Sequence, residues 1–142
     1  MTRRAALALT LLVLCFPGSA QAQDVDGFMA RVASAWRRGD AEAISALADR
    51  GGISIEVEGT HVGAIPPRQA AAVLRRVFTD RETIKAVAGP ARTMPGNQRR
   101  AYAEIVWERR SRGTTQPERV NVFIAVARDG AAWRITEIRL MP

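Results

Sequence analysis

The spacing of apolar residues changes at Phe78, and this change constrains the fold more than any other feature of the sequence. Up to Phe78 most apolar residues recur every three or four positions, as they do on amphipathic helices. Beyond it they alternate with polar residues, as in strands with one buried face, over residues 83–88, 99–110, 119–128 and 132–140. The pattern therefore predicts an α+β domain in which helices precede a sheet.

Two helices are predicted at the start of this domain. The first covers residues 25–38, where Met29 and Trp36 belong to one apolar face, and Gly39 ends it. Asp40 then provides a favourable N-cap for a second, short helix. The domain is thus expected to open with a helical hairpin.

A single strand and a third helix are predicted to follow the hairpin. Residues Ile53–Val57 alternate apolar and polar side chains, and a loop through His61 and Gly63 is expected after them. Pro66-Pro67 is well suited to the start of a helix. The expected element order is therefore ααβαββββ.

The predicted elements imply a particular shape. Three helices must cover one face of a sheet whose last strands are long enough to bend, so we expect a strongly curved, mainly antiparallel sheet. It would wrap around the helices like half a cone and enclose a pocket. Asp129-Gly130 is predicted to form a type I′ hairpin turn between the last two strands.

Residues Met1–Ala22 have the features of an export signal. Arg3 and Arg4 form a charged start, an apolar run too short to span a bilayer follows, and Ala20-Gln21-Ala22 is a small-x-small cleavage site. Cys15 lies inside the apolar run and would be removed with it. We expect a mature single domain of residues 23–142 that is periplasmic or secreted and keeps no stable membrane anchor.

The chain is basic, with a formal net charge of +7. Of its 21 basic residues only Lys85 is a lysine, and the arginines are scattered through every segment. Because they line no single helix and no aromatic residues are interleaved with them, nucleic-acid binding is not expected. A mature chain without cysteine, with one histidine and no clustered acids, predicts no disulfide, no metal site and no cofactor.

Three polar residues are candidate catalytic groups, although a structural role is the expected one for each. Tyr102 would donate its hydroxyl into a pocket or occupy a half-buried packing position. Glu137 interrupts an apolar strand, where it would act as a base or form an ion pair with Arg139 or Arg119. His61 would move a proton or lie in solvent as a loop residue.

Three further residues are candidates for ligand binding. Asn121 and Phe123 share a face of the penultimate strand, where an amide among apolar side chains would orient a ligand inside the cone. Trp36 could line the same pocket, but it lies in the apolar register of its helix, which is typical of core packing.

Several stretches of the chain match, in order and spacing, those of a known family: Trp36–Asp40, Ile53–Val57, Gln69-Ala70 with Val77-Phe78, Val120–Phe123 and Trp133–Leu140. Through them the sequence resembles the nuclear transport factor 2-like superfamily, which has a cystatin-like α+β cone. Within it, the chain is similar to a bacterial secreted domain of unknown function, family 4783. The resemblance implies the cone-shaped fold. The superfamily hosts isomerases, dehydratases, hydrolases, transport adaptors and dimerisation modules, so the fold leaves the function open.

The sequence is therefore expected to encode an exported, non-catalytic binding module. Its cone-shaped pocket would take a small apolar ligand or a protein partner, and it would form a homodimer through its sheet. Two alternatives remain: an isomerase- or dehydratase-type enzyme that uses a pocket tyrosine and glutamate, and arginine-mediated binding of anionic envelope polymers.

Overall fold

The computed structural model describes residues 20–142, so the expected export signal lies almost entirely outside the described residues. In this part of the chain three helices and seven strands follow one another. The helices are α1 (Ala20–Arg38), α2 (Ala41–Ala46) and α3 (Pro67–Thr79). The strands are β1 (Ile53–Val57), β2 (Thr60–Ile65), β3 (Arg81–Ala88), β4 (Arg92–Met94), β5 (Asn97–Ser111), β6 (Glu118–Asp129) and β7 (Ala132–Met141). The predicted α+β class is confirmed.

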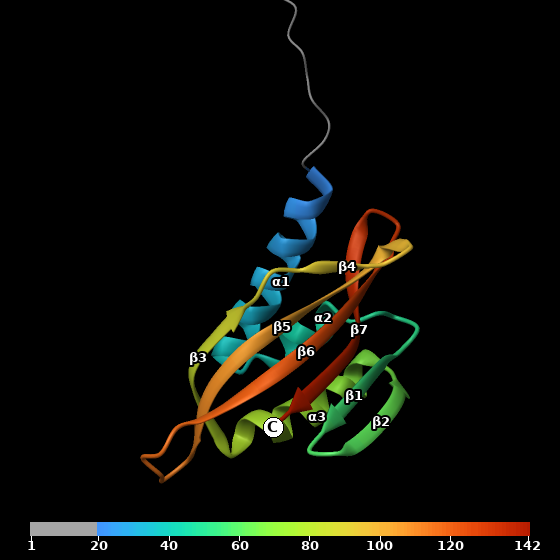
Figure 1. Ribbon diagram of the computed structural model, residues 1–142. Coiled ribbons are helices and arrows are strands. Elements are labelled where there is room, and N and C mark those ends of the chain that lie inside the picture. Colours follow the sequence, from blue (N-terminus) through green and yellow to red (C-terminus); the bar gives the residue numbers. More distant parts are fainter. Residues whose placement is uncertain (1–19) are drawn as a thin grey trace, which may run out of the picture.

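The strands form one sheet in the order β2-β1-β7-β6-β5-β3, and β4 pairs with β5 beside this path. Paired strands are antiparallel except β1 and β7, which run parallel. The longest strands, β5, β6 and β7, have 15, 12 and 10 residues, and they twist and bend along their length (Figure 1). The sheet is therefore strongly curved, as expected.

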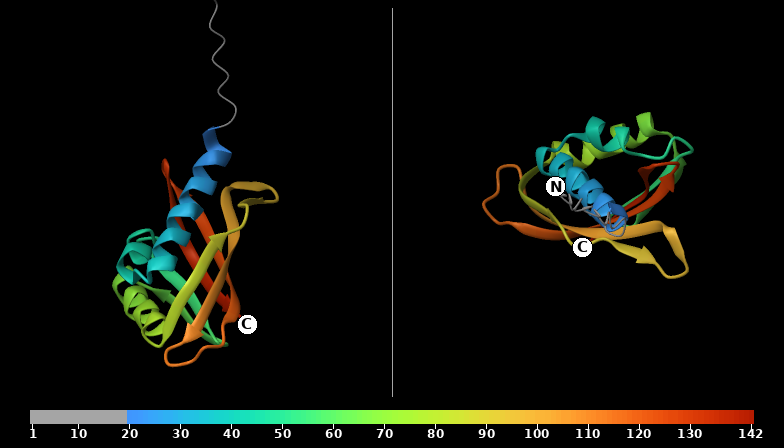
Figure 2. Two further views of the ribbon diagram at one scale, coloured as in Figure 1. Left: turned by 90° about the vertical axis from the view of Figure 1, so that its left-hand side faces the viewer. Right: turned by 90° about the horizontal axis from the view of Figure 1, so that it is seen from above.

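All three helices lie on the same side of the sheet (Figure 2). We call the sheet face toward them the inner face and the opposite one the outer face. On β5 the side chains of Ala101, Ala103, Ile105 and Trp107 are buried on the inner face, while the residues between them are exposed or half-buried. This period of two is the one that the sequence predicts after Phe78.

An aromatic cluster joins the helical layer to the sheet. Trp36 of α1 lies with its ring centroid 5.1 Å from that of Phe78 in α3 and 5.5 Å from that of Trp107 in β5. The rings meet nearly at right angles, which is a favourable geometry for aromatic pairs. Trp36 and Trp107 are fully buried. Core packing, the structural role expected for Trp36, is what the contacts show.

The ends of the helices follow the signals in the sequence. Gly39, with a φ of +63°, ends α1 in a conformation that residues with a Cβ rarely adopt. Asp40 caps α2, and its Oδ1 accepts a hydrogen bond of 2.9 Å from the backbone N–H of Ala43. Gly39 and Asp40 thus define the turn between α1 and α2, the helical hairpin that precedes the sheet in the sequence.

Two strands, β2 and β4, were not predicted. The segment around His61 and Gly63 is a strand and not a loop, since β2 pairs with β1 across a tight turn at Glu58-Gly59. Its alternation is interrupted by a bulge and by Ala64, which has a φ of +51°. Strand β4 has only three residues and lies between two prolines. Neither segment carries the regular alternation by which a strand is recognised.

The hairpin between β6 and β7 is confirmed, but its turn lies one residue further along than predicted. Asp129 pairs with Ala132, so the two central residues are Gly130 and Ala131. Of the four, only Gly130 has a positive φ, of +60°. A positive φ at the first central residue alone is the pattern of a type II′ turn, whereas type I′ requires two.

We expect Trp36→Ala to lower the free energy of unfolding by about 3–5 kcal/mol, because it leaves a cavity between the helices and the sheet. Urea denaturation measures the change. Arg37→Ala, at the neighbouring exposed position of α1, is the control and should change stability by less than about 0.5 kcal/mol. Equal effects of the two substitutions would contradict the role of the aromatic cluster.

The turn assignment predicts that Gly130→Ala lowers stability by about 1–2 kcal/mol, because a Cβ is strained at this positive φ. The added methyl group meets no neighbouring atom, so the backbone conformation alone is tested. Ala131→Gly provides the matched control with a smaller effect. If Ala131→Gly instead stabilised the protein, Ala131 would be the strained position and the assignment would be wrong.

Candidate functional site

A hollow of about 490 Å³ opens between α3 and the β1-β2 hairpin, on the inner face of the sheet. Its apolar wall consists of one isoleucine and four valines: Ile55, Val57, Val62, Val73 and Val77. Ile55, Val57 and Val62 lie on the inner face of β1 and β2. Val73 and Val77, four positions apart, lie on the side of α3 that faces these strands. The wall is thus a direct product of the periods of two and of 3.6 in these elements.

Polar side chains complete the lining of the hollow. They are Glu58, Thr60, Arg76, Asp80, Arg81 and Arg109. The three arginines approach from α3, β3 and β5, so residues far apart in sequence meet here. The combination of an apolar wall with converging charges is typical of small-molecule sites.

Arg109 is the one polar or charged residue that is buried among the described residues, with 5% of its surface exposed. It occupies the inner-face register of β5, two positions after Trp107, and its guanidinium carbon lies 4.7 Å from the centre of the Trp107 ring. Its Nε donates a hydrogen bond of 3.1 Å to Oε2 of Glu118 on β6. The guanidinium is therefore held by an aromatic face and by one carboxylate.

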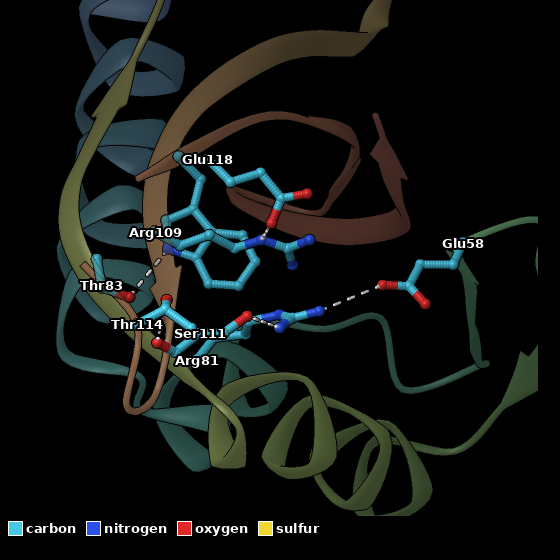
Figure 3. A network of polar contacts seen from close by, with 8 residues as sticks. Glu58, Arg81, Thr83, Arg109, Ser111, Thr114 and Glu118 are labelled. Carbon is cyan, nitrogen blue, oxygen red and sulfur yellow. Dashed lines mark hydrogen bonds and ion pairs between the residues drawn. The ribbon is translucent and has the colours of Figure 1, made fainter. Parts of the chain in front are cut away.

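Arg81 comes from β3, which pairs with β5 on the side opposite to β6 and its Glu118. Its Nη1 donates a hydrogen bond to Oγ of Ser111, and its Nη2 lies 3.9 Å from a carboxylate oxygen of Glu58. Figure 3 shows the guanidinium groups of Arg81 and Arg109 extending in the same direction, into the space that faces Glu58. The side chain of Glu58 is 69% exposed, so this ion pair is a weak one.

The two remaining charged groups of the lining lie at the rim. Arg76 lies in the last turn of α3, and Asp80 is the residue directly after this helix. Both side chains are exposed. Neither forms an ion pair with a described residue. The lining as a whole carries three arginines and two carboxylates, which leaves one positive charge in excess.

An ion pair between β3 and β5, outside the lining of the hollow, affects the titration of one carboxyl group. Arg110 donates two hydrogen bonds of 2.9 Å to Glu82, and these hold the pKa of Glu82 below its ordinary value. A lowered pKa stabilises the fold above the ordinary carboxyl pKa, and this contribution is lost as the pH falls through the lowered pKa. Because the side chains of Arg110 and Glu82 are 39% and 49% exposed, the pair is a minor contributor to stability.

The three catalytic candidates of the sequence lie on the outer face, and none of them lines the hollow. Tyr102 stacks on Phe123, with 5.6 Å between ring centroids, and lines a separate surface depression with Glu104 and Val106. Glu137 forms an ion pair with Arg139, the structural role that its sequence context favours. His61 is exposed on β2, with its Nε2 3.5 Å from Oγ of Ser54.

The candidate ligand-binding residues also lie away from the hollow. In β6 the side chains of Val120, Val122 and Ile124 are the ones on the inner face, so Asn121 and Phe123 point outward. The expected facing was therefore wrong by one residue, which in a strand exchanges the two faces. Trp36 is buried in the aromatic cluster and does not reach the hollow.

The charged residues of the hollow were missed by the sequence analysis, yet one signal for them exists. Counting from Ala101, every second residue of β5 is apolar until Arg109, which occupies the next inward position. A charge in an apolar register requires a partner or a function. Arg76 and Arg81 offer no such signal, because they follow the ordinary pattern of exposed residues.

Two absences hold for the residues that the structure describes. No group of three or more histidine, cysteine, aspartate or glutamate side chains is placed to hold a metal ion. Between residues 20 and 142, no helix has the length and apolar character needed to cross a bilayer.

Comparison with known proteins supports the fold. No protein-family model and no curated protein sequence matches this chain. A ketosteroid isomerase-like protein from Erwinia carotovora atroseptica superimposes with a TM-score of 0.70 and 13% identity, covering 87% of this chain and 97% of that one. A domain of unknown function with a cystatin-like fold from Nostoc punctiforme gives a TM-score of 0.66 at 18% identity, covering 87% and 78%.

A protein of the DUF4783 family from Bacteroides uniformis also gives a TM-score of 0.66, at 9% identity, and covers 78% of this chain and 93% of that one. The resemblance inferred from the sequence is thus confirmed at the level of the fold: the domain has a cone-shaped fold like those of cystatin-like and nuclear transport factor 2-like proteins. At such low identities the similarity carries no residue roles to this chain.

The buried position of Arg109 predicts opposite effects for the two partners of its ion pair. Glu118→Gln should lower the free energy of unfolding by about 1 kcal/mol, since it leaves a buried cation uncompensated. Arg109→Met should leave stability unchanged or raise it, because an apolar side chain of similar length suits the site. Chemical denaturation measures both, with Glu104→Gln on the exposed outer face as the control.

A loss of about 3 kcal/mol or more in Arg109→Met would identify Arg109 as a structural residue. That result would contradict the interpretation that the charge of Arg109 serves a function in the hollow and lowers the free energy of unfolding.

Proposed function

We propose that this protein is an exported binding protein that holds one small molecule in the hollow between α3 and the β1-β2 hairpin. The observation that carries the proposal is the lining itself, which combines a continuous apolar wall with three arginines in one open cavity. A cavity of about 490 Å³ lies within the range of small-molecule sites, about 300–1,000 Å³.

The arrangement of the lining favours binding over structural packing. A hollow lined by Val57, Val62 and Val77 leaves apolar surface in contact with water, and covering that surface with a ligand is favourable. Arg81 and Arg109, which also line the hollow, would orient the ligand. The proposal that the protein is exported rests on residues Met1–Ala22, as argued from the sequence.

Proton-transfer catalysis is the second candidate, because one of the similar folds is that of a ketosteroid isomerase-like protein. Such a reaction requires a base beside the substrate and a group that stabilises the resulting oxyanion. The carboxylates in the lining, Glu58 and Asp80, are both exposed, and Tyr102, Glu137 and His61 lie on the outer face. Binding is therefore the function that we propose.

The fluorescent probe N-phenylnaphthylamine, which is neutral and apolar, tests the proposal. We expect the protein to bind it with increased fluorescence and to lose at least about tenfold in affinity in Val77→Trp, because the indole fills the hollow. Val87→Trp is the matched control, since Val87 is an exposed valine on β3 that does not line the hollow.

Equal affinities in the two tryptophan variants would show that the probe binds elsewhere. Absence of binding to the unmodified protein, together with no gain in thermal stability across a library of apolar small molecules, would contradict the proposed function.

A further inference from the structure

We infer that the ligand of the hollow is a small organic anion, with an apolar body and one carboxylate that binds between Arg109 and Arg81. This inference rests on the proposed function and adds the chemical class of the ligand. It arises from Arg109, the one buried charged residue among those that the structure describes, and from the fact that its guanidinium makes one hydrogen bond to these residues.

The guanidinium of Arg109 has donors to spare. An arginine carries five N–H donors, and the hydrogen bond from Nε to Glu118 is the only one that this group makes to a described residue. Its terminal nitrogens are not among the buried polar atoms that lack a partner, so they remain accessible from the hollow. Arg109 is thus almost entirely buried, with 6% of its side chain exposed, and its terminal nitrogens, the fork of the guanidinium, are unpaired among the described residues and are the donors that a ligand in the hollow would reach.

The orientation of this fork is fixed in advance. Trp107 supports the guanidinium from one side at 4.7 Å, and Glu118 holds Nε at 3.1 Å. With Nε occupied, the donors left are those of the terminal nitrogens, whose geometry matches the two oxygens of a carboxylate. Little side-chain entropy is lost when a ligand binds to a group already held in place.

Arg81 supplies a second cation to the same space (Figure 3). Among residues 20–142 its only carboxylate contact is with the exposed Glu58, at 3.9 Å, a distance typical of a weak ion pair. A ligand carboxylate that approached more closely would replace this weak contact. Arg81 and Arg109, whose guanidinium groups extend in the same direction, can then bind one anion together.

The charge and the size of the hollow define the ligand further. Arg109 is paired with Glu118 and Arg81 only weakly with Glu58, so one ligand carboxylate in place of the Glu58 contact is the anionic charge that the hollow accommodates. The valines of β1, β2 and α3 adjoin the arginines, so the apolar body of the ligand has a wall to cover. A hollow of about 490 Å³ suits one small molecule, and a polymer could place only a short segment in it.

Displacement of bound N-phenylnaphthylamine by octanoate and by octanol tests the inference, because the two differ in the charged group at the end of the same chain. We expect octanoate to displace the probe at a concentration about ten- to hundredfold lower than octanol does. This ratio corresponds to the free energy of hydrogen bonds to a charged group. In Arg109→Met this preference should fall to about twofold or less, and in Arg81→Met it should fall partway. Arg100→Met, an exposed arginine on the same strand, is the control and should keep the full preference.

Thermal unfolding shows whether each variant is folded. If Arg109→Met does not fold, Arg109→Lys takes its place, since it retains the charge but loses the fork and should reduce the preference for octanoate. Inorganic phosphate, which has no apolar body, should displace the probe poorly.

Two failures are distinguishable. If the neutral probe does not bind, the proposed function is wrong. If the probe binds in the hollow but octanoate and octanol displace it equally, or if Arg109→Met and Arg81→Met both keep the preference, the hollow is a ligand site and the inference of an anion is overturned.

Discussion

The packing of Trp36 against Phe78 and Trp107 is the interaction on which the rest of the structure depends. It joins α1, α3 and β5 at one point and thereby sets the distance between the helical layer and the sheet. Beyond this cluster the sheet continues to β1 and β2, while the helical layer offers only the side of α3. The aromatic rings hold the helical layer and the sheet apart, and beside them the facing side chains are smaller valines. These valines do not fill the space between the layers, so a hollow remains there.

Arg109 connects this packing to the proposed function. It follows Trp107 in the inward register of β5, and the same ring that fills the core supports its guanidinium. Removing an arginine from water is costly, and its ion pair with a half-exposed Glu118 offsets only part of the cost. A protein under selection for stability alone would have an apolar residue at this position, so the charge indicates a function.

The sequence was sufficient to predict the elements that have a regular period. The helices, strand β1 and the four longest strands of the second part follow from apolar spacing, and the cone follows from their order. Strand β2 was missed because Gly63 and the bulge interrupt its alternation, and β4 because three residues between prolines show no period. The turn after β6 shifted by one residue because Asp129-Gly130 and Gly130-Ala131 both satisfy the local rules for a hairpin.

The candidate site could not be predicted in the same way, because its polar residues meet only through the fold. Arg81 and Arg109 are 28 positions apart and belong to strands paired antiparallel in the sheet, β3 and β5. The sequence did identify residues whose chemistry attracts attention, such as Tyr102 and Glu137, but their faces depend on a register that one residue can reverse. Of the charged residues in the hollow, only Arg109 could have been identified from the sequence, because it is a charged residue at an apolar position of the alternating pattern in β5.

The two faces of the sheet differ in what surrounds their charged groups, and this difference separates structure from function. On the outer face Arg139 contacts both Glu56 and Glu137 and lies over the ring of Phe123, which itself stacks on Tyr102. Although Nε of Arg139 makes no hydrogen bond, the charge of this side chain is paired with two carboxylates, so the cluster requires no further anion. On the inner face the guanidinium of Arg109 keeps open donors beside an apolar wall, at a place where burial makes each hydrogen bond stronger. A molecule that brings an anionic group and an apolar surface together supplies what the inner face lacks.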